Sequence, residues 1–143
     1  MNLREISKLF YQLKLANQEM TAKFEKETGF SITRYELMMF LKENGQCSQT
    51  ILQKELKIDS AAVTRHLKIL EDKNYVTRER NQQNNREVFV KITSKAFNEL
   101  ETCEKKYSSS EKQIHVSLND QEGELLLELL TKLVKWKRPI NMS

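Results

Sequence analysis

Glycine, proline and long apolar runs are all scarce in this 143-residue chain. Three glycines and one proline are too few for the frequent turns of a β-sandwich, so helices must dominate. No apolar run approaches the ~18 residues that a membrane span needs, and the first residues do not form a secretory signal. We therefore expect a folded protein of the cytoplasm with no membrane partner.

Cysteine, histidine clusters and catalytic motifs are also lacking. Cys47 and Cys103 are the only thiols and show no C-x-x-C spacing, so we expect both to be reduced. Cys103 is expected to be a small buried hydrophobe; Cys47, predicted in a loop, is the more open to oxidation, although a structural role is favoured. His66 and His115 have no ligand partners at metal-binding spacing. With no nucleophile or phosphate-loop motif either, we expect no metal, no cofactor and no enzyme.

The positive charge is concentrated in one segment. The chain has 24 Lys and Arg against 20 Asp and Glu, a net charge of +4. Between Ser48 and Thr93, nine basic residues face six acidic ones, and nine minus six leaves +3 there. This segment is the place to look for an anionic partner.

Two helices are predicted before this segment. Apolar residues recur at three- and four-residue steps from Ile6 to Phe24, which indicates one long helix that Gly29 ends. Thr33 and Glu36 have the spacing of a capping box in front of a second helix, which closes at Asn44-Gly45.

A pair of helices with a short connection follows. Ser48 is expected to cap a short third helix, and Asp59 or Ser60 to cap a fourth that runs to about Lys73. Two helices joined by three or four residues form a helix-turn-helix.

The periodicity then changes from 3.6 to 2. The segments Tyr75–Arg80 and Val88–Ile92 predict two strands, and the polar, uncharged residues Asn81–Asn85 predict the tip of the hairpin between them. A β-hairpin directly after a helix-turn-helix is a wing.

Helices return after Thr93. One apolar stripe is predicted on a helix that frays around Ser108–Ser110. Its members are Phe97, Leu100, Cys103, Tyr107 and Ile114. Asn119 and Glu122 open a last helix, expected to run through Trp136 and to stop at Pro139. That helix is leucine-rich on more than one side, which favours a homodimer with Trp136 as an anchor; burial within its own domain is the alternative.

The fourth predicted helix has two distinct faces. Val63, Leu67 and Leu70 fall on one line and should face the core. The opposite surface carries small, hydroxyl and basic residues suited to the major groove of double-stranded DNA. Its members are Ser60, Ala61, Thr64, Arg65 and Lys68. An ordinary solvated helix face is the alternative.

Arginines of the wing extend this surface. Arg78 and Arg80 alternate on the first strand, and Arg86 near the tip is placed to enter a minor groove. Charged residues also protect an edge strand from aggregation, and the two roles are compatible.

These features together resemble a known family. They occur in a fixed order along Ile32–Thr93: Leu56, Val63-Thr64-Arg65, Leu67, Leu70-Glu71, Tyr75-Val76-x-Arg78, Arg86 and Ile92-Thr93. In this order and spacing, with the long first helix and leucine-rich last helix, the chain resembles the MarR family of bacterial transcription regulators.

The resemblance implies a fold that is mainly α with a small β-wing. A winged helix-turn-helix lobe (31–93) would be flanked by N- and C-terminal dimerisation helices (1–30 and 94–143) within a single MarR-like domain (1–143). The homodimer would bind a pseudo-palindromic operator and repress a nearby gene. A winged-helix module that binds a protein rather than specific DNA is the alternative function.

Two positions depart from the family pattern. Asn84-Asn85-Arg86 stands where the family has Asp-x-Arg, so the arginine loses a charge-assisted partner. Asn74 replaces a glycine, and asparagine tolerates a left-handed backbone better than most residues.

The resemblance also implies a small-molecule effector. Candidate pocket residues at the junction between the dimer helices and the DNA-binding lobe are Phe10, Leu13, Met38 and Phe97. Apolar residues at helical spacing are usually core, and that alternative stays open.

Overall fold

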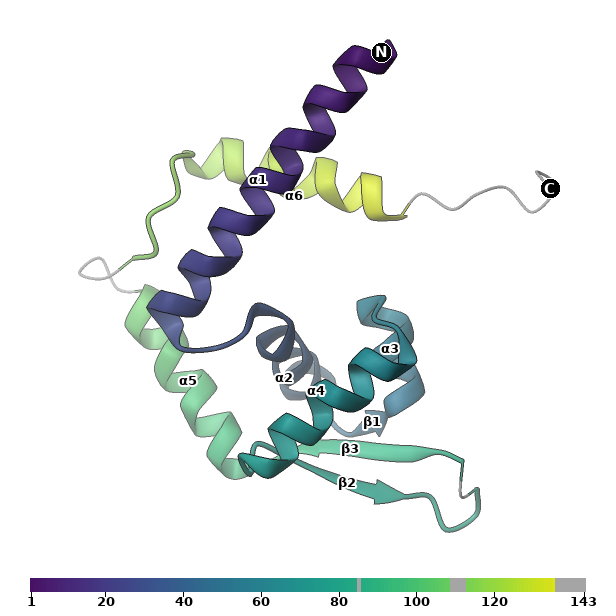
Figure 1. Ribbon diagram of the computed structural model, residues 1–143. Helices are drawn as coiled ribbons and strands as arrows, with labels where there is room; N and C mark the ends of the chain where they lie inside the picture. Colours follow the sequence, from purple (N-terminus) through teal and green to yellow (C-terminus); the bar gives the residue numbers. More distant parts are fainter. Residues whose placement is uncertain (85, 109–112, 136–143) are drawn as a thin grey trace, which may run out of the picture. The chain divides into compact units, whose positions relative to one another are not determined.

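The computed structural model describes residues 1–84, 86–108 and 113–135, and the chain forms two compact units, residues 1–113 and 114–143. Within these residues the structure is helical with one small antiparallel sheet, as predicted. In chain order the elements are α1 (Leu3–Thr28), α2 (Ile32–Asn44), β1 (Cys47–Ser48), α3 (Gln49–Leu56), α4 (Ser60–Asp72), β2 (Val76–Arg80), β3 (Val88–Ile92), α5 (Ser94–Ser108) and α6 (Asp120–Lys135) (Figure 1).

Two glycines end the first two helices, and a serine begins the second. Gly29 ends α1 with a φ of 78°, and Gly45 ends α2 with a φ of 79°, both in the region that glycine adopts without strain. The start of α2 differs from the prediction, because Ser31 is the N-cap and its hydroxyl accepts the N–H of Arg34. The helix begins at Ile32, so Thr33 lies within its first turn and the predicted capping box is wrong.

The helix-turn-helix is confirmed. The Ser48 hydroxyl accepts the N–H of Ile51 at the start of α3, and the Asp59 carboxylate accepts the N–H of Ala62 at the start of α4. Lys57, with a φ of 54°, ends α3 in a left-handed conformation, which turns the chain sharply toward α4. The turn between the two helices contains three residues, Lys57 to Asp59.

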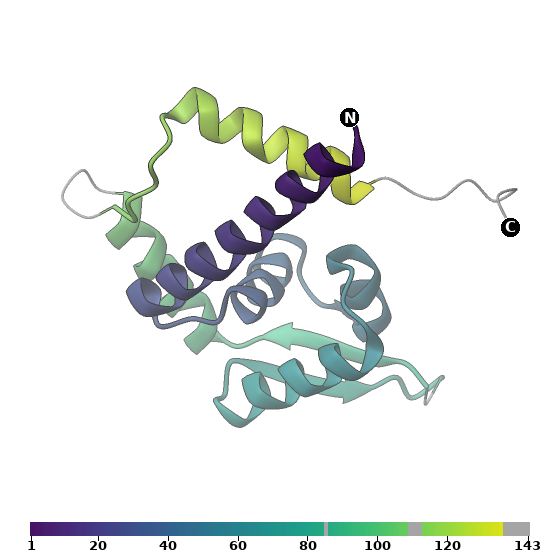
Figure 2. The same ribbon diagram turned by 45° about the horizontal axis from the view of Figure 1, so that its top comes forward.

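The wing consists of β2 and β3, with Val76 opposite Ile92 and Arg78 opposite Val90. A short strand that the sequence analysis missed, β1, pairs with the other edge of β3, so the strand order is β1-β3-β2. Asn74 precedes the hairpin with a φ of 62°, the left-handed conformation expected there. In both views α4 lies along the hairpin (Figures 1 and 2).

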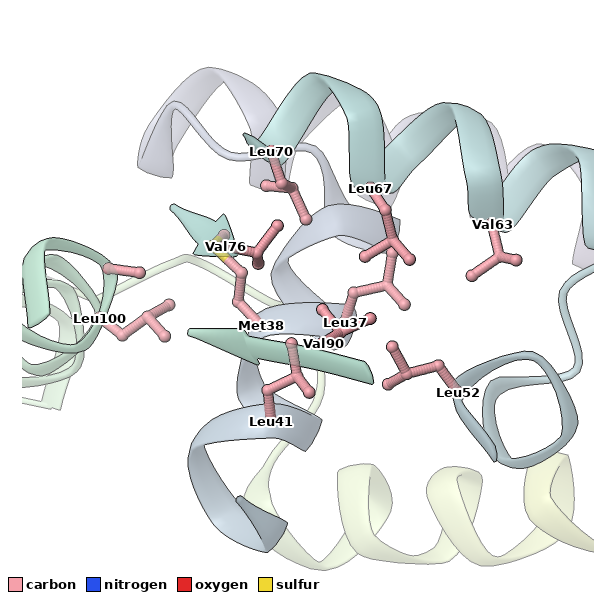
Figure 3. Close-up of a cluster of buried hydrophobic side chains, with 11 residues drawn as sticks. Leu37, Met38, Leu41, Leu52, Val63, Leu67, Leu70, Val76, Val90 and Leu100 are labelled. Atoms are coloured by element: carbon pink, nitrogen blue, oxygen red, sulfur yellow. The ribbon is translucent and has the colours of Figure 1, made fainter. Parts of the chain in front are cut away.

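One apolar core holds this lobe together. It draws side chains from α2, α3, α4, β2, β3 and α5, all with at most 2% exposure. The buried residues are Leu37, Met38, Leu41, Leu52, Val63, Leu67, Leu70, Val76, Val90, Ala96 and Leu100. Figure 3 shows Val63, Leu67 and Leu70 of α4 pointing into it, which confirms the predicted inward face. This anchoring determines which side of α4 faces outward.

The apolar stripe of α5 differs from the prediction. Ala96 and Leu100 are buried and Cys103 and Tyr107 are half-buried, whereas Phe97 is 43% exposed. At about 100° per residue, positions 96, 100, 103 and 107 share a narrow line from which Phe97 is rotated by about 100°. Phe97 is therefore not on the buried stripe, and Ile114 lies beyond the end of α5.

The last helix begins as predicted. Asn119 accepts the N–H of Glu122 through its side chain, and Glu122 accepts the N–H of Asn119 in return. This capping box starts α6 at Asp120. Trp136 and Pro139, predicted as dimer anchor and helix stop, lie outside the described residues.

Candidate DNA interface

The outward face of α4 carries the predicted contact residues. All five predicted positions are exposed: Ser60, Ala61, Thr64, Arg65 and Lys68. Small side chains occupy the first turn, and the two long basic side chains follow along the same surface. Such a face can approach the floor of a major groove closely while its cations reach phosphates or base edges.

Arg65 and Lys68 have no ion-pair partner within the part of the chain that the structure describes. The carboxylate of Glu71, one turn along, is instead paired with Arg78. Both cations are therefore available to an external anion, as an electrostatic interface with DNA requires.

Thr64 is connected to the start of α3. Gln49 Nε2 donates a hydrogen bond to Thr64 Oγ1 at 2.8 Å, and Thr64 Oγ1 donates to the carbonyl oxygen of Ser60 at 2.9 Å. Gln49 was not identified from the sequence. Its contact depends on how the helix-turn-helix folds back, which no local pattern reveals.

The opposite flank of α4 touches α2. Arg34 Nη1 lies 3.4 Å from Nδ1 of the half-buried His66. Burial, then the nearby charges of Arg34 and Arg65, hold the pKa of His66 below its usual value, since each disfavours the imidazolium form. A neutral His66 is therefore favoured at neutral pH.

Arg78 connects the wing to α4 through an ion pair with Glu71. Its Nη2 and Nε donate to the two carboxylate oxygens of Glu71 at 3.0 and 3.3 Å. This two-pronged hydrogen bond lowers the pKa of Glu71, because it stabilises the carboxylate. In this arrangement Arg78 joins β2 to the last turn of α4; its predicted contact with DNA stays a prediction, and the role of Glu71 was not foreseen.

The wing tip is organised by asparagines. Asn84 Oδ1 accepts the backbone N–H of Arg86 at 3.1 Å, and Asn81 Oδ1 accepts the backbone N–H of Gln83 at 2.9 Å. Asn84 thus orients the main chain of Arg86. In the family pattern, the aspartate at this position orients the arginine guanidinium instead. Arg86 is exposed, so its side chain is free to reach a groove.

The four candidate pocket residues have different surroundings. Met38 is a core residue at 1% exposure, Phe10 is 58% exposed on α1, and Leu13 is half-buried on the same helix. Phe97 borders a groove of about 360 Å³ together with Lys42 and Lys91, and the other three candidates do not line that groove. Phe97 therefore lies beside a defined groove.

Both thiols are free and half-buried. Burial raises the pKa of Cys47 and of Cys103, and a raised pKa keeps a thiol protonated and slow to oxidise. Cys47 lies in β1 rather than in the predicted loop.

Within the described ranges, no group of three or more potential ligands could hold a metal ion, and no helix is long and apolar enough to cross a membrane.

The fold and the exposed basic face of α4 define a winged helix-turn-helix module. A model of the MarR family matches residues 30–88. YdgJ of Bacillus subtilis strain 168, an uncharacterized HTH-type transcriptional regulator, is 37% identical over 129 residues, which make up 90% of this chain and 79% of YdgJ. This chain belongs to the MarR family.

Solved structures have the same fold. A mutant MarR from E. coli, complexed with operator DNA, matches with a TM-score of 0.78 at 23% identity, over 94% of this chain and 99% of that one. BpsR of Bordetella bronchiseptica, whose DNA binding is regulated by 6-hydroxynicotinic acid, matches with a TM-score of 0.73 at 20% identity, over 89% and 98%. The predicted resemblance and fold are confirmed, and family membership makes the chain a DNA-binding transcriptional regulator. Regulators of this family are typically not enzymes.

Proposed function

We propose that this regulator acts as a homodimeric repressor that binds a pseudo-palindromic operator, with one α4 in each of two successive major grooves. The observation that carries the proposal is the exposure on α4 of two cations, Arg65 and Lys68, which have no ion-pair partner among the described residues and lie beside the small residues of the first turn. Arg65 would read a guanine and Lys68 would bind a phosphate. Such a regulator works in the cytoplasm on double-stranded DNA and performs no catalysis of its own.

The terminal helices support the homodimer. Neither the 26-residue α1 nor the 16-residue α6 has a buried residue, although both carry apolar side chains. On α6, Leu129 and Leu133 are each 50% exposed and Leu127 is 67% exposed. A second copy of the chain would cover these faces by a two-fold contact, and two-fold symmetry matches the symmetry of a pseudo-palindrome.

The wing would add contacts on either side of the α4 sites. Arg86 is exposed near the tip, next to uncharged amides, and an arginine of this kind suits the strong negative potential of a narrow minor groove. Arg78 would act at the base of the wing, near the phosphates. The two half-sites would lie about one helical turn apart, roughly 34 Å.

An effector response is the least constrained part of the proposal. BpsR, a structural relative, changes its DNA binding with a small aromatic acid. The groove beside Phe97 offers an aromatic ring and the cation of Lys91, since Lys42 is already paired with Glu101 and Glu104. Phe10 and Leu13 belong to α1. An effector can release DNA only if it prefers the conformation that does not bind DNA, so differential affinity decides the response.

Selection of bound sequences from a random DNA library tests the DNA-binding proposal. We expect one enriched pseudo-palindrome, bound with an affinity that falls steeply as salt rises. Arg65→Ala should weaken binding to the enriched sequence by about 1–3 kcal/mol and random DNA much less, whereas Lys68→Ala should weaken both alike. The absence of any enrichment, together with weak or absent binding to DNA at low salt, would favour the protein-interaction module instead.

Light scattering at micromolar concentration tests the homodimer. The wild-type chain should have the mass of two copies. Leu129→Glu combined with Leu133→Glu should reduce that mass to one copy, because two carboxylates cannot be buried without partners. Lys132→Glu on the same helix is the matched control and should stay dimeric. A monomeric wild-type chain would contradict the proposal.

A further inference from the structure

The hydroxyl of Thr64 is already committed within the protein. Its proton goes to the carbonyl oxygen of Ser60 at 2.9 Å, and Oγ1 accepts from Gln49 Nε2 at 2.8 Å. A threonine hydroxyl has one proton and two lone pairs, so one lone pair is left and no donor. Thr64 therefore cannot donate a hydrogen bond to guanine O6 or N7, nor to thymine O4.

The same accounting determines the orientation of the Gln49 amide. Because the Thr64 proton is used by Ser60, Oγ1 can only accept from Gln49, and only the nitrogen end of an amide donates. Nε2 must therefore be the end of Gln49 that faces Thr64. The contact is a directed hydrogen bond between the first residue of α3 and the exposed face of α4.

This bond selects one conformation of Thr64. In a helix, threonine divides between two χ1 rotamers, since its hydroxyl can bond the carbonyl one turn earlier in only one of them. Gln49 adds a second bond to that same rotamer. With the hydroxyl held, the exposed Thr64 side chain has its γ-methyl and one acceptor lone pair left to offer, and the γ-methyl is the group that projects beyond these two hydrogen bonds.

A methyl group on a major-groove face has one natural counterpart among the bases. Thymine alone presents a C5-methyl in the major groove, and apolar contact with it distinguishes thymine from the other bases. Resting on the proposed DNA-binding function, we infer that Gln49 is a positioning residue which holds Thr64 so that α4 reads a thymine through methyl contact.

The test uses the enriched sequence from the random-library selection and replaces its thymines, one at a time, by deoxyuridine. This change removes only the C5-methyl group. At one thymine in each half-site, the wild-type protein should lose about fourfold in affinity, the factor expected for one methyl group that is no longer buried. Thr64→Val, which keeps a methyl group and loses the hydroxyl, should retain that sensitivity, because its own β-branching confines valine largely to one rotamer in a helix.

Two substitutions should abolish or reduce the sensitivity. Thr64→Ser keeps the hydroxyl and lacks the methyl group, so it should bind thymine and deoxyuridine equally. Gln49→Ala should reduce the difference in binding free energy between thymine and deoxyuridine DNA to less than half of the wild-type difference, with little change in affinity for random DNA. Gln46→Ala, an exposed glutamine three residues earlier, is the matched control and should behave as wild type. Equal melting temperatures for all variants exclude misfolding as the cause.

Each contrary result has a distinct meaning. Full deoxyuridine sensitivity in Thr64→Ser, or none at any thymine in the wild type, overturns the methyl contact while leaving the proposed function intact. Full sensitivity in Gln49→Ala overturns the positioning role. A protein that enriches no sequence at all overturns both this inference and the proposed function.

Discussion

Leu67 and Lys68 are neighbours on α4 with opposite surroundings, and their alanine variants should separate folding from DNA binding. Leu67 is fully buried in the apolar core of the lobe, whereas Lys68 is exposed. Truncation of a leucine at such a site leaves a cavity and costs about 2–5 kcal/mol. For a chain of this size that lowers the melting temperature by roughly 2–4 °C per kcal/mol, or about 10 °C in the middle of the range.

Lys68→Ala should leave stability within about 0.5 kcal/mol of wild type and change the salt dependence of DNA binding instead. Removal of one phosphate contact reduces the slope of log affinity against log salt by about 0.9 per subunit. Thermal melts by circular dichroism at fixed protein concentration measure the first quantity, and fluorescence anisotropy at several salt concentrations measures the second.

The two variants should give a crossed result. Leu67→Ala, assayed well below its melting temperature, should keep the wild-type salt slope, and Lys68→Ala should keep the wild-type melting temperature. Comparable destabilisation by both variants would refute the orientation of α4. An unchanged salt slope in Lys68→Ala would refute its contact with phosphate.

Three further variants test the surroundings of α4. Glu71→Gln should cost at most about 1 kcal/mol at neutral pH, because the pair with Arg78 is partly exposed; since the folded pKa of Glu71 is depressed, the difference should vanish as pH falls through that pKa, and a loss that persists in acid would contradict the ion pair. The folded pKa of His66 lies below the usual value of about 6.5 for histidine, so the wild type should lose stability as pH drops from 6.5 through that pKa. For His66→Gln, the free energy of unfolding measured by urea denaturation should change less with pH over that range. Parallel pH profiles for the two proteins would exclude His66 as the cause. Arg86→Ala should weaken binding to the enriched sequence less than Arg65→Ala does, and a larger loss would make the wing the main reader.

Local patterns were sufficient for the elements that position the interface. Val63, Leu67 and Leu70 share one line of a helix, so the outward face of α4 follows from geometry once the core side is known. The change of period after Lys73 marked the wing in the same way, and Asn74 showed the left-handed turn that precedes it. Each of these signals lies within a few residues of chain.

Other features depend on contacts that sequence does not display. Gln49 and Thr64 are fifteen residues apart, and only the folded helix-turn-helix brings them together. The cap of α2 was misplaced because Ser31 and Thr33 both satisfy the residue preference of an N-cap, and the backbone decides between them. Phe97 was assigned to the buried stripe of α5 because positions three and four residues apart compete for one face until the neighbouring helix selects one.

Methylation interference at guanine N7 tests the central claim, that the outward face of α4 reads bases in the major groove, most directly. On the enriched sequence, methylation should block the wild-type protein at guanines in two clusters about one helical turn apart. In Arg65→Ala, one guanine in each cluster should lose its effect, because that variant no longer uses its N7. An interference pattern identical in the two proteins would contradict the account. So would a wild-type pattern in which methylation of no guanine N7 interferes with binding.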